Sequence, residues 1–161
     1  MTAEQIISAL ELAPLIGEGG AFRRNYLSKA CLSSGKPLAS AIYYLLKRDT
    51  FSRMHRLKND EVYHFYLGAR VELLLLYPDG SGETVFLGTD ILNGERVQQV
   101  VPAGTWQGSR IAGEGEFALL GCTVSPAYDQ ADYEDGGMEE LLRLYPKYAS
   151  LLRILAQPPK Y

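Results

Sequence analysis

The sequence predicts an all-β protein, a sandwich or small barrel, with short helices at its two ends. Between about residues 21 and 124, short apolar or aromatic runs are separated by turn residues, which is the pattern of consecutive strands. The separators include Pro78-Asp-Gly80 and Asn93-Gly94, which are strong turn signals. The segments on either side change to the spacing of helices. At least seven strands at this spacing favour a sandwich or barrel.

The N-terminal segment predicts a short amphipathic helix over residues 3–12. Ile6, Ile7 and Leu10 fall on one face of that helix. Pro14 and the glycine cluster that follows it then end the helix.

The C-terminal segment has the spacing of helices. We predict two short helical segments over residues 137–156, separated by Pro146 and packed against the outside of the barrel. No linker divides the chain, so we expect one domain over residues 1–161 with its barrel at about 20–135. The seven strand candidates are AFRRNYLS, SAIYYLL, VYHFYLG, VELLLLY, ETVFLGT, VQQVVP and EFALLGCTV.

Composition excludes several classes of protein. The chain is 47% hydrophobic and 22% charged, which is typical of a globular domain and not of a disordered one. A net charge of -3 with scattered Lys and Arg gives no basic field for nucleic acid. The sequence has neither a signal peptide nor an apolar segment of bilayer length, so we expect a cytoplasmic protein with no membrane partner. Cys31 and Cys122 lie far apart and are expected to be free thiols.

Both histidines of the chain lie within one segment, residues 55–68, together with an acidic residue. Histidine is the side chain best suited to carry protons or bind metals near neutral pH. Because side chains alternate along a strand, an inward-facing Glu61 leaves His64 on the opposite face. His55 and Glu61 are therefore the favoured inward pair. The alternation assigns Glu61, Tyr63 and Phe65 to one face and Val62, His64 and Tyr66 to the other.

This segment and several others resemble the motifs of the cupin superfamily. The chain is similar, over roughly residues 5–150, to a single-domain cupin subfamily of largely unassigned function. The resemblance implies a cupin double-stranded β-helix, which is a jelly-roll-like barrel, with an internal pocket and usually a homodimeric assembly. The matching motifs are Glu18-Gly-Gly-x-Phe-Arg23, His55-Arg-x-x-x-Asp-Glu-x-x-His-Phe-Tyr-x-Gly68, Pro102-Ala-Gly-Thr-Trp-Gln107 and Gly121-Cys-Thr-Val124.

The resemblance also bears on metal binding. Metal-dependent cupins use a His-x-His pair, a downstream Glu and a further His, but this chain has Leu57 and Gln107 at two of those positions. A catalytic metal generally needs about three protein ligands. We therefore predict no cofactor, while a divalent metal remains an alternative with His55, Glu61 and Gln107 as its ligands.

Other cupins, among them deoxysugar epimerases, work without metal through a pocket histidine, a carboxylate and a tyrosine or water. This similarity predicts metal-independent acid/base chemistry, as in an epimerase, isomerase, cyclase or dehydratase, on a small carbonyl-bearing or specialised metabolite. Two alternatives stay open: a non-catalytic module that binds a small molecule, and a metal-dependent lyase or dioxygenase. The candidate catalytic residues are His55, Glu61, His64 and Tyr66, and the candidate pocket residues are Tyr43, Tyr63, Phe65, Gln98, Trp106 and Gln107.

Two features near the N-terminus bear on the ligand that we expect. Residues 17–20 are glycine-rich but lack a following Lys-Ser or Lys-Thr and precede a strand, so they do not form a phosphate loop. The next run, residues 21–28, departs from the Tyr-Phe-Arg-Glu-Thr-Tyr-Arg-Ser of similar cupins and carries Arg24 in place of the acid. If this strand lines the pocket, the ligand differs from that of most of the family.

Overall fold

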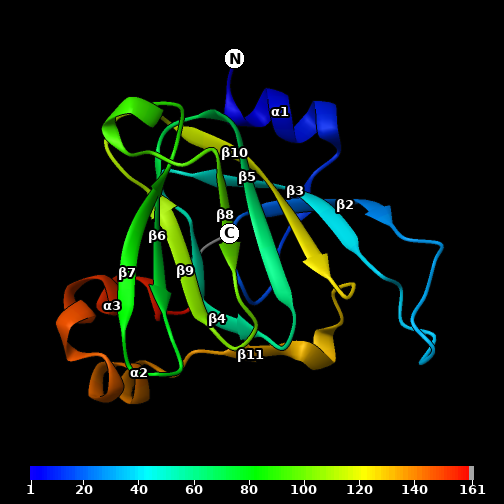
Figure 1. Ribbon diagram of the computed structural model, residues 1–161. Coiled ribbons are helices and arrows are strands. Elements are labelled where there is room, and N and C mark those ends of the chain that lie inside the picture. The colour runs from blue at the N-terminus through cyan, green and yellow to red at the C-terminus, as the bar shows by residue number, and fades with distance from the viewer. Residues whose placement is uncertain (160–161) are drawn as a thin grey trace.

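Two antiparallel sheets packed face to face form the body of the protein in a computed structural model that describes residues 1–159 (Figure 1). The six-stranded sheet has the order β1-β2-β3-β10-β5-β8, and the five-stranded sheet has the order β11-β4-β9-β6-β7. This arrangement, with short helices near both ends, confirms the predicted all-β fold. The strands are β1 (Ala13–Pro14), β2 (Ala21–Leu27), β3 (Ser40–Lys47), β4 (Phe51–Leu57), β5 (Asp60–Gly68), β6 (Val71–Leu76), β7 (Gly82–Leu87), β8 (Gln98–Val101), β9 (Trp106–Ile111), β10 (Phe117–Ser125) and β11 (Tyr133–Asp135).

Four of these strands were not predicted, namely β1, β4, β9 and β11. The strands β4 and β9 lie side by side and bring His55 opposite Gln107. Both carry polar residues that are buried, including Ser52 on β4 and Ser109 on β9. Because an apolar run was the criterion for a strand, buried polar positions hid both strands.

An apolar core fills one half of the space between the sheets. Leu73 and Leu75 of β6 contribute to it from the five-stranded sheet, and Tyr63 and Phe65 of β5 from the six-stranded sheet. All four side chains are buried. Burial of such a cluster is the main stabilising contribution of the barrel interior.

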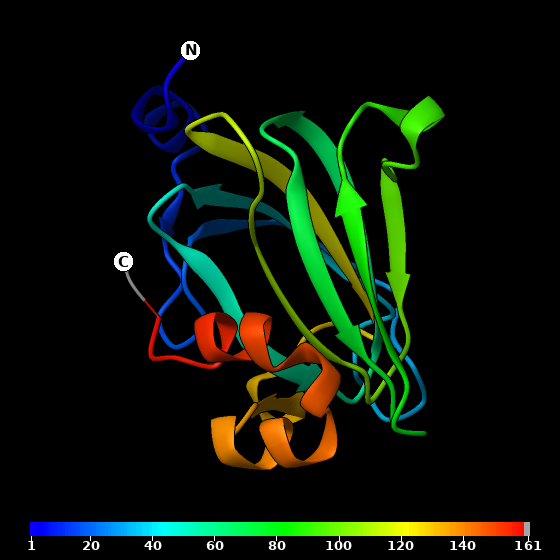
Figure 2. The ribbon, with the colours of Figure 1, turned by 90° about the vertical axis from the view of Figure 1, so that its left-hand side faces the viewer.

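The helices cover the outer faces of the sheets. Helix α1 (Ala3–Leu10) begins with a capping box in which Thr2 and Gln5 exchange hydrogen bonds, and it packs against Leu45 of β3. Figure 2 shows α2 (Met138–Leu144) and α3 (Ala149–Leu155) outside the five-stranded sheet, as predicted for the C-terminal segment. The 3-10 turns are η1 (Ile91–Asn93), η2 (Gln130–Asp132) and η3 (Pro146–Tyr148). Among the described residues, every helix is too short or too polar to cross a bilayer.

Candidate functional site

The other half of the space between the sheets holds a cavity of about 530 Å³, which is in the range of small-molecule binding sites. Both sheets and the segment before β2 contribute to its wall. Most of the wall is apolar, while acidic and basic groups gather at a few positions. The lining residues are Glu11, Ala13, Leu15, Glu18, Phe22, Arg23, Arg24, Ser40, Ile42, Tyr44, His55, Leu57, Glu61, Cys122, Val124 and Tyr128.

His55 is held in one orientation in the wall of this cavity. It lies on β4 with only 2% of its surface exposed, and its Nδ1 is 2.7 Å from the carbonyl oxygen of Arg53. Because a carbonyl oxygen can only accept, Nδ1 must carry the hydrogen. The ring of Tyr133 stacks on the imidazole at 5.1 Å and 15°. In the neutral imidazole, the lone pair is therefore on Nε2.

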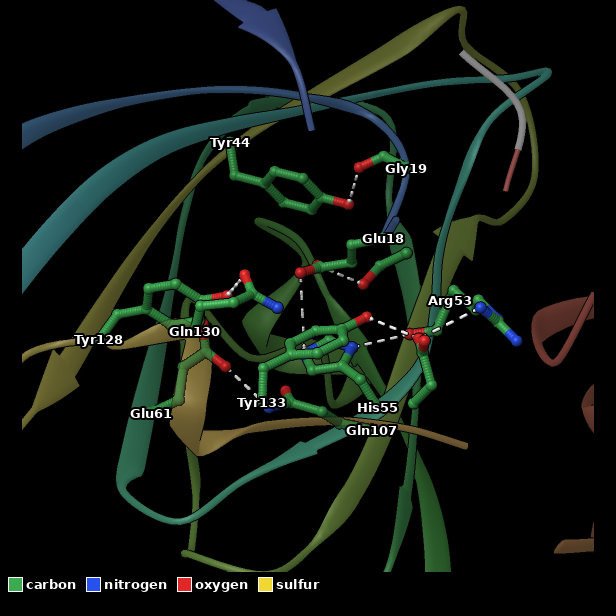
Figure 3. A network of polar contacts seen from close by, with 12 residues as sticks. Glu18, Gly19, Tyr44, Arg53, His55, Glu61, Gln107, Tyr128, Gln130 and Tyr133 are labelled. Atoms are coloured by element: carbon green, nitrogen blue, oxygen red, sulfur yellow. Dashed lines mark hydrogen bonds and ion pairs between the residues drawn. The ribbon is translucent and has the colours of Figure 1, made fainter. Parts of the chain in front are cut away.

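Glu18 reaches the same site from the turn before β2. Its Oε2 lies 4.0 Å from Nε2 of His55, and its Oε1 accepts a hydrogen bond of 2.7 Å from Ser52. The glycines on either side make this approach possible, since Gly19 has φ +107° and an added Cβ would lie 2.3 Å from the carbonyl oxygen of Phe51. The glycine-rich turn thus positions a carboxylate beside the histidine (Figure 3).

Glu61 supplies a second carboxyl group from β5 on the opposite sheet. Its Oε2 accepts a hydrogen bond of 2.7 Å from Nε2 of Gln107, and the Cys122 thiol lines the same cavity. Burial raises the pKa of Glu61, while the nearby His55 opposes this shift and Glu18 adds to it. Its environment therefore favours the protonated carboxyl group more than water does.

Two tyrosines also border the cavity. The Tyr44 hydroxyl donates to the carbonyl oxygen of Gly19 over 2.9 Å, and burial raises its pKa well above the usual value. The Tyr128 hydroxyl donates to Gln130 over 2.9 Å, and burial raises its pKa to about 12. Both hydroxyl groups therefore keep their protons at neutral pH.

The structure places the predicted site residues in three different environments. His55 and Glu61 line the cavity, and Gln107 contacts Glu61 from β9. Tyr63 and Phe65 face the interior as the alternation predicts, but they belong to the apolar core. Only the predicted pair and its amide partner therefore form part of the candidate site.

The remaining predicted residues lie on outer faces. His64 contacts Thr123 through Nε2 at 3.2 Å and Gln98 through Nδ1 at 3.3 Å, on the outside of the six-stranded sheet. Tyr43 and Tyr66 pack edge to face on that same surface. Placing these residues in the site requires a correction, because alternation along β3, β5 and β8 turns them away from the cavity.

Trp106 needs a similar correction. It precedes the inward-facing Gln107 on β9 and so points outward, where it packs in the cluster formed with α2 and α3. The guanidinium of Arg56 lies 4.4 Å from the centre of its ring. Trp106 therefore packs against the C-terminal helices and is not among the residues that line the cavity.

Sequence reasoning missed Glu18, Tyr44 and Tyr128 as site residues. Glu18 stands among glycines and opens the motif Glu18-Gly-Gly-x-Phe-Arg23, but neither pattern indicates that its carboxylate reaches the histidine. Tyr128 lies in the loop after β10, which crosses to the cavity and has no strand periodicity.

A metal ion is not well matched by these side chains. Among residues 1–159, no group of three or more His, Cys, Asp or Glu side chains is arranged to hold one. Leu57 faces the cavity two residues after His55, and the Gln107 amide is turned so that its NH₂ group donates to Glu61. The donor set thus differs from a three-ligand catalytic site.

The double-sheet barrel and its internal cavity define the chain as a cupin-type protein. A family model described as Cupin superfamily (DUF985) matches residues 4–135, and the chain belongs to this family. It is 30% identical to the uncharacterized protein YML079W of Saccharomyces cerevisiae, in a match that covers 86% of this chain and 79% of that protein.

Two solved structures extend the comparison. Protein SO0799 from Shewanella oneidensis is 36% identical, with a TM-score of 0.90 and coverage of 98% of this chain and 99% of that chain. An oxalate decarboxylase variant of Bacillus subtilis has a TM-score of 0.59 at 13% identity and covers 96% of this chain and 40% of that chain. The second likeness concerns the fold alone. The homodimer and the cytoplasmic location expected from the sequence stay predictions.

Proposed function

We propose that this cupin performs acid/base chemistry on a small carbonyl-bearing metabolite, with His55 as the proton carrier. The reaction class is epimerisation, isomerisation, cyclisation or dehydration. The observation that carries the proposal is the hydrogen bond between Nδ1 of His55 and the Arg53 carbonyl oxygen, because it leaves Nε2 as the proton acceptor beside Glu18.

The surroundings of His55 support proton transfer in both directions. When Nε2 takes a proton, the new positive charge lies near the Glu18 carboxylate, whose Oε2 is 4.0 Å away. Because His55 is buried, this attraction is stronger than it would be in bulk solvent. The stacked ring of Tyr133 and the bond to Arg53 prevent the imidazole from rotating. Orientation of the base is thus set before the ligand arrives.

Glu61 is suited to the complementary role of acid. Burial raises its pKa, so it can hold a proton and donate it toward a carbonyl oxygen. In the proposed step, the C–H bond next to the carbonyl breaks and its proton goes to Nε2 of His55. The C–H electron pair forms a C=C bond, the C=O π pair moves to the oxygen, and that oxygen takes the proton of Glu61, which gives an enol. The enol returns this proton to Glu61 when the carbon is protonated again. Return of a proton to the opposite face gives an epimer, and return to a neighbouring carbon gives an isomer.

Tyr128 is the better candidate for a second proton carrier than the predicted Tyr66. It lines the cavity, and its raised pKa keeps the hydroxyl group protonated and able to donate. Tyr66 lies on the outer face of β5.

Deuterium exchange tests the proposal without knowledge of the natural substrate. The protein is incubated in D₂O with a panel of aldehydes, ketones and oxo acids, and loss of the proton signal next to the carbonyl is followed by NMR. We expect exchange with the wild type and a loss of about 10²- to 10⁴-fold in His55→Asn, which keeps an NH group near the Nδ1 position but has no base at Nε2.

His64→Asn is the matched control, because the second histidine lies outside the cavity. It should exchange at the wild-type rate. Undiminished exchange in His55→Asn would refute the proposal. Thermal stabilisation of the wild type by panel compounds with no exchange would identify a non-catalytic binding module instead.

A further inference from the structure

We infer that Arg24 binds a carboxylate group of the ligand where the cavity opens to solvent, so that the ligand is a carbonyl-bearing carboxylic acid. The carbonyl half of this statement rests on the proposed function, and the carboxylate half rests on Arg24. The side chain lines the cavity and is also exposed, which places it at the opening.

The register of β2 and β3 turns Arg24 toward the cavity. Arg24 pairs with Ile42 and Phe22 pairs with Tyr44, and all four residues line the cavity. Arg23 lies between them on the strand, and its Nη1 donates to the carbonyl oxygen of Leu10 over 3.2 Å. Alternation therefore sends the two adjacent guanidinium groups in different directions.

The charge of Arg24 is not balanced by a neighbour. Arg23 forms an ion pair of 2.7 Å with Glu11, whereas the side chain of Arg24 has no hydrogen bond or ion pair with any residue in 1–159. An arginine that lines a cavity with its five donors free is suited to bind an anion from solution.

The distribution of charge inside the cavity gives the anion one favourable position. Glu18 lies beside His55, and its carboxylate would repel a second anion placed there. At the opening, Arg24 attracts it instead. A ligand with a carboxylate at one end is therefore oriented with its other end toward His55.

A carboxylate fits this site better than a phosphate does. One guanidinium group can bind one carboxylate through two parallel hydrogen bonds. Phosphate sites usually add further cations or the backbone N–H groups of a helix N-terminus. Among the described residues that line the cavity, the only other basic side chains are the paired Arg23 and the buried His55, and α1 contributes none of its first turn.

Calorimetric binding of oxo acids tests the inference. The probes are 4-oxopentanoate, 5-oxohexanoate and 6-oxoheptanoate, the methyl ester of each, and inorganic phosphate. We expect at least one acid to bind the wild type, and its methyl ester to bind about tenfold more weakly or worse. Arg24→Met should weaken the acid by a similar factor and leave the ester unchanged, and Arg24→Lys should keep part of the affinity. Arg143→Met, at an exposed arginine on α2, is the control and should bind as the wild type does.

Several results would overturn the inference: no acid binds, acids and esters bind equally, or Arg24→Met retains the affinity of the wild type. Displacement of the acid by an equal concentration of inorganic phosphate would show that Arg24 binds a phosphate group of the ligand, and it would overturn the assignment of a carboxylate. Binding is measured separately from deuterium exchange. Binding that depends on Arg24 but is not accompanied by deuterium exchange refutes the proposed function alone. Deuterium exchange that is equal for acids and esters, and that Arg24→Met does not change, refutes only this inference.

Discussion

Replacing Glu61 by glutamine should make the protein progressively more stable than the wild type as the pH rises. Burial raises the pKa of Glu61 in the folded state above its usual value of 4.5, so the folded protein binds more protons than the unfolded chain. Between pH 4.5 and the higher folded-state pKa, the unfolded chain loses this proton while the folded protein keeps it, so the contribution of Glu61 to the stability of the wild type falls as the pH rises. The glutamine variant has no such group and can still accept the hydrogen bond from Gln107.

The size of this effect follows from proton linkage. One proton changes the free energy of unfolding by at most about 1.4 kcal/mol per pH unit. For a chain of this length, each kcal/mol moves the melting temperature by roughly 2–4 °C. The difference between Glu61→Gln and wild type should thus grow by up to about 3–6 °C per pH unit within the window and then level off.

Thermal unfolding followed by circular dichroism at a series of pH values measures this difference. Glu114→Gln, at an exposed position in the turn before β10, is the control and should give a difference that does not depend on pH. The titratable groups that interact with Glu61 are present in both proteins, namely His55, Glu18, Cys122, Tyr44, Tyr63 and Tyr128. A Glu61→Gln difference that is constant, or that shrinks as the pH rises, would refute the reasoning.

Two further predictions concern the same cavity. Gln107→Leu leaves the buried carboxyl group without its amide donor, so we expect a loss of about 1–3 kcal/mol in the free energy of unfolding, measured with urea at neutral pH. Stability equal to the wild type would show that the bond to Glu61 contributes little. Chelation should leave the deuterium exchange of the purified protein unchanged, and elemental analysis should find no stoichiometric transition metal. One metal ion per chain, with exchange lost on its removal, would contradict the assignment of the chemistry to His55.

The parts of the fold that could be predicted are those that follow periodicity. Alternation on β5 correctly separated Glu61 from His64, because one face of that strand is packed and the other faces outward. Turn residues marked the ends of most strands. The strands β4 and β9 were not predicted, because they carry buried polar residues, such as Ser52 and Gln107, at positions where a strand of the apolar core carries apolar residues.

The rest of the site depends on contacts between distant segments. Glu18 lies 37 positions before His55 in the sequence, and only the packing of the glycine turn against β4 brings them together. Tyr133 reaches the same imidazole from the far end of the chain through the pairing of β11 with β4. No local pattern encodes either contact, because each is a product of tertiary structure.

The opposite orientations of the two histidines give the protein a pair of internal spectroscopic reporters. His55 carries its hydrogen on Nδ1, while His64 accepts a hydrogen bond from Gln98 at Nδ1 and so carries its hydrogen on Nε2 when neutral. These opposite tautomers give distinct ¹⁵N chemical shifts in a chain with only two imidazoles. The His55 signal reports on the cavity, and the His64 signal reports on the outer surface. A single spectrum of the unmodified protein therefore distinguishes a ligand that enters the barrel from one that binds outside it.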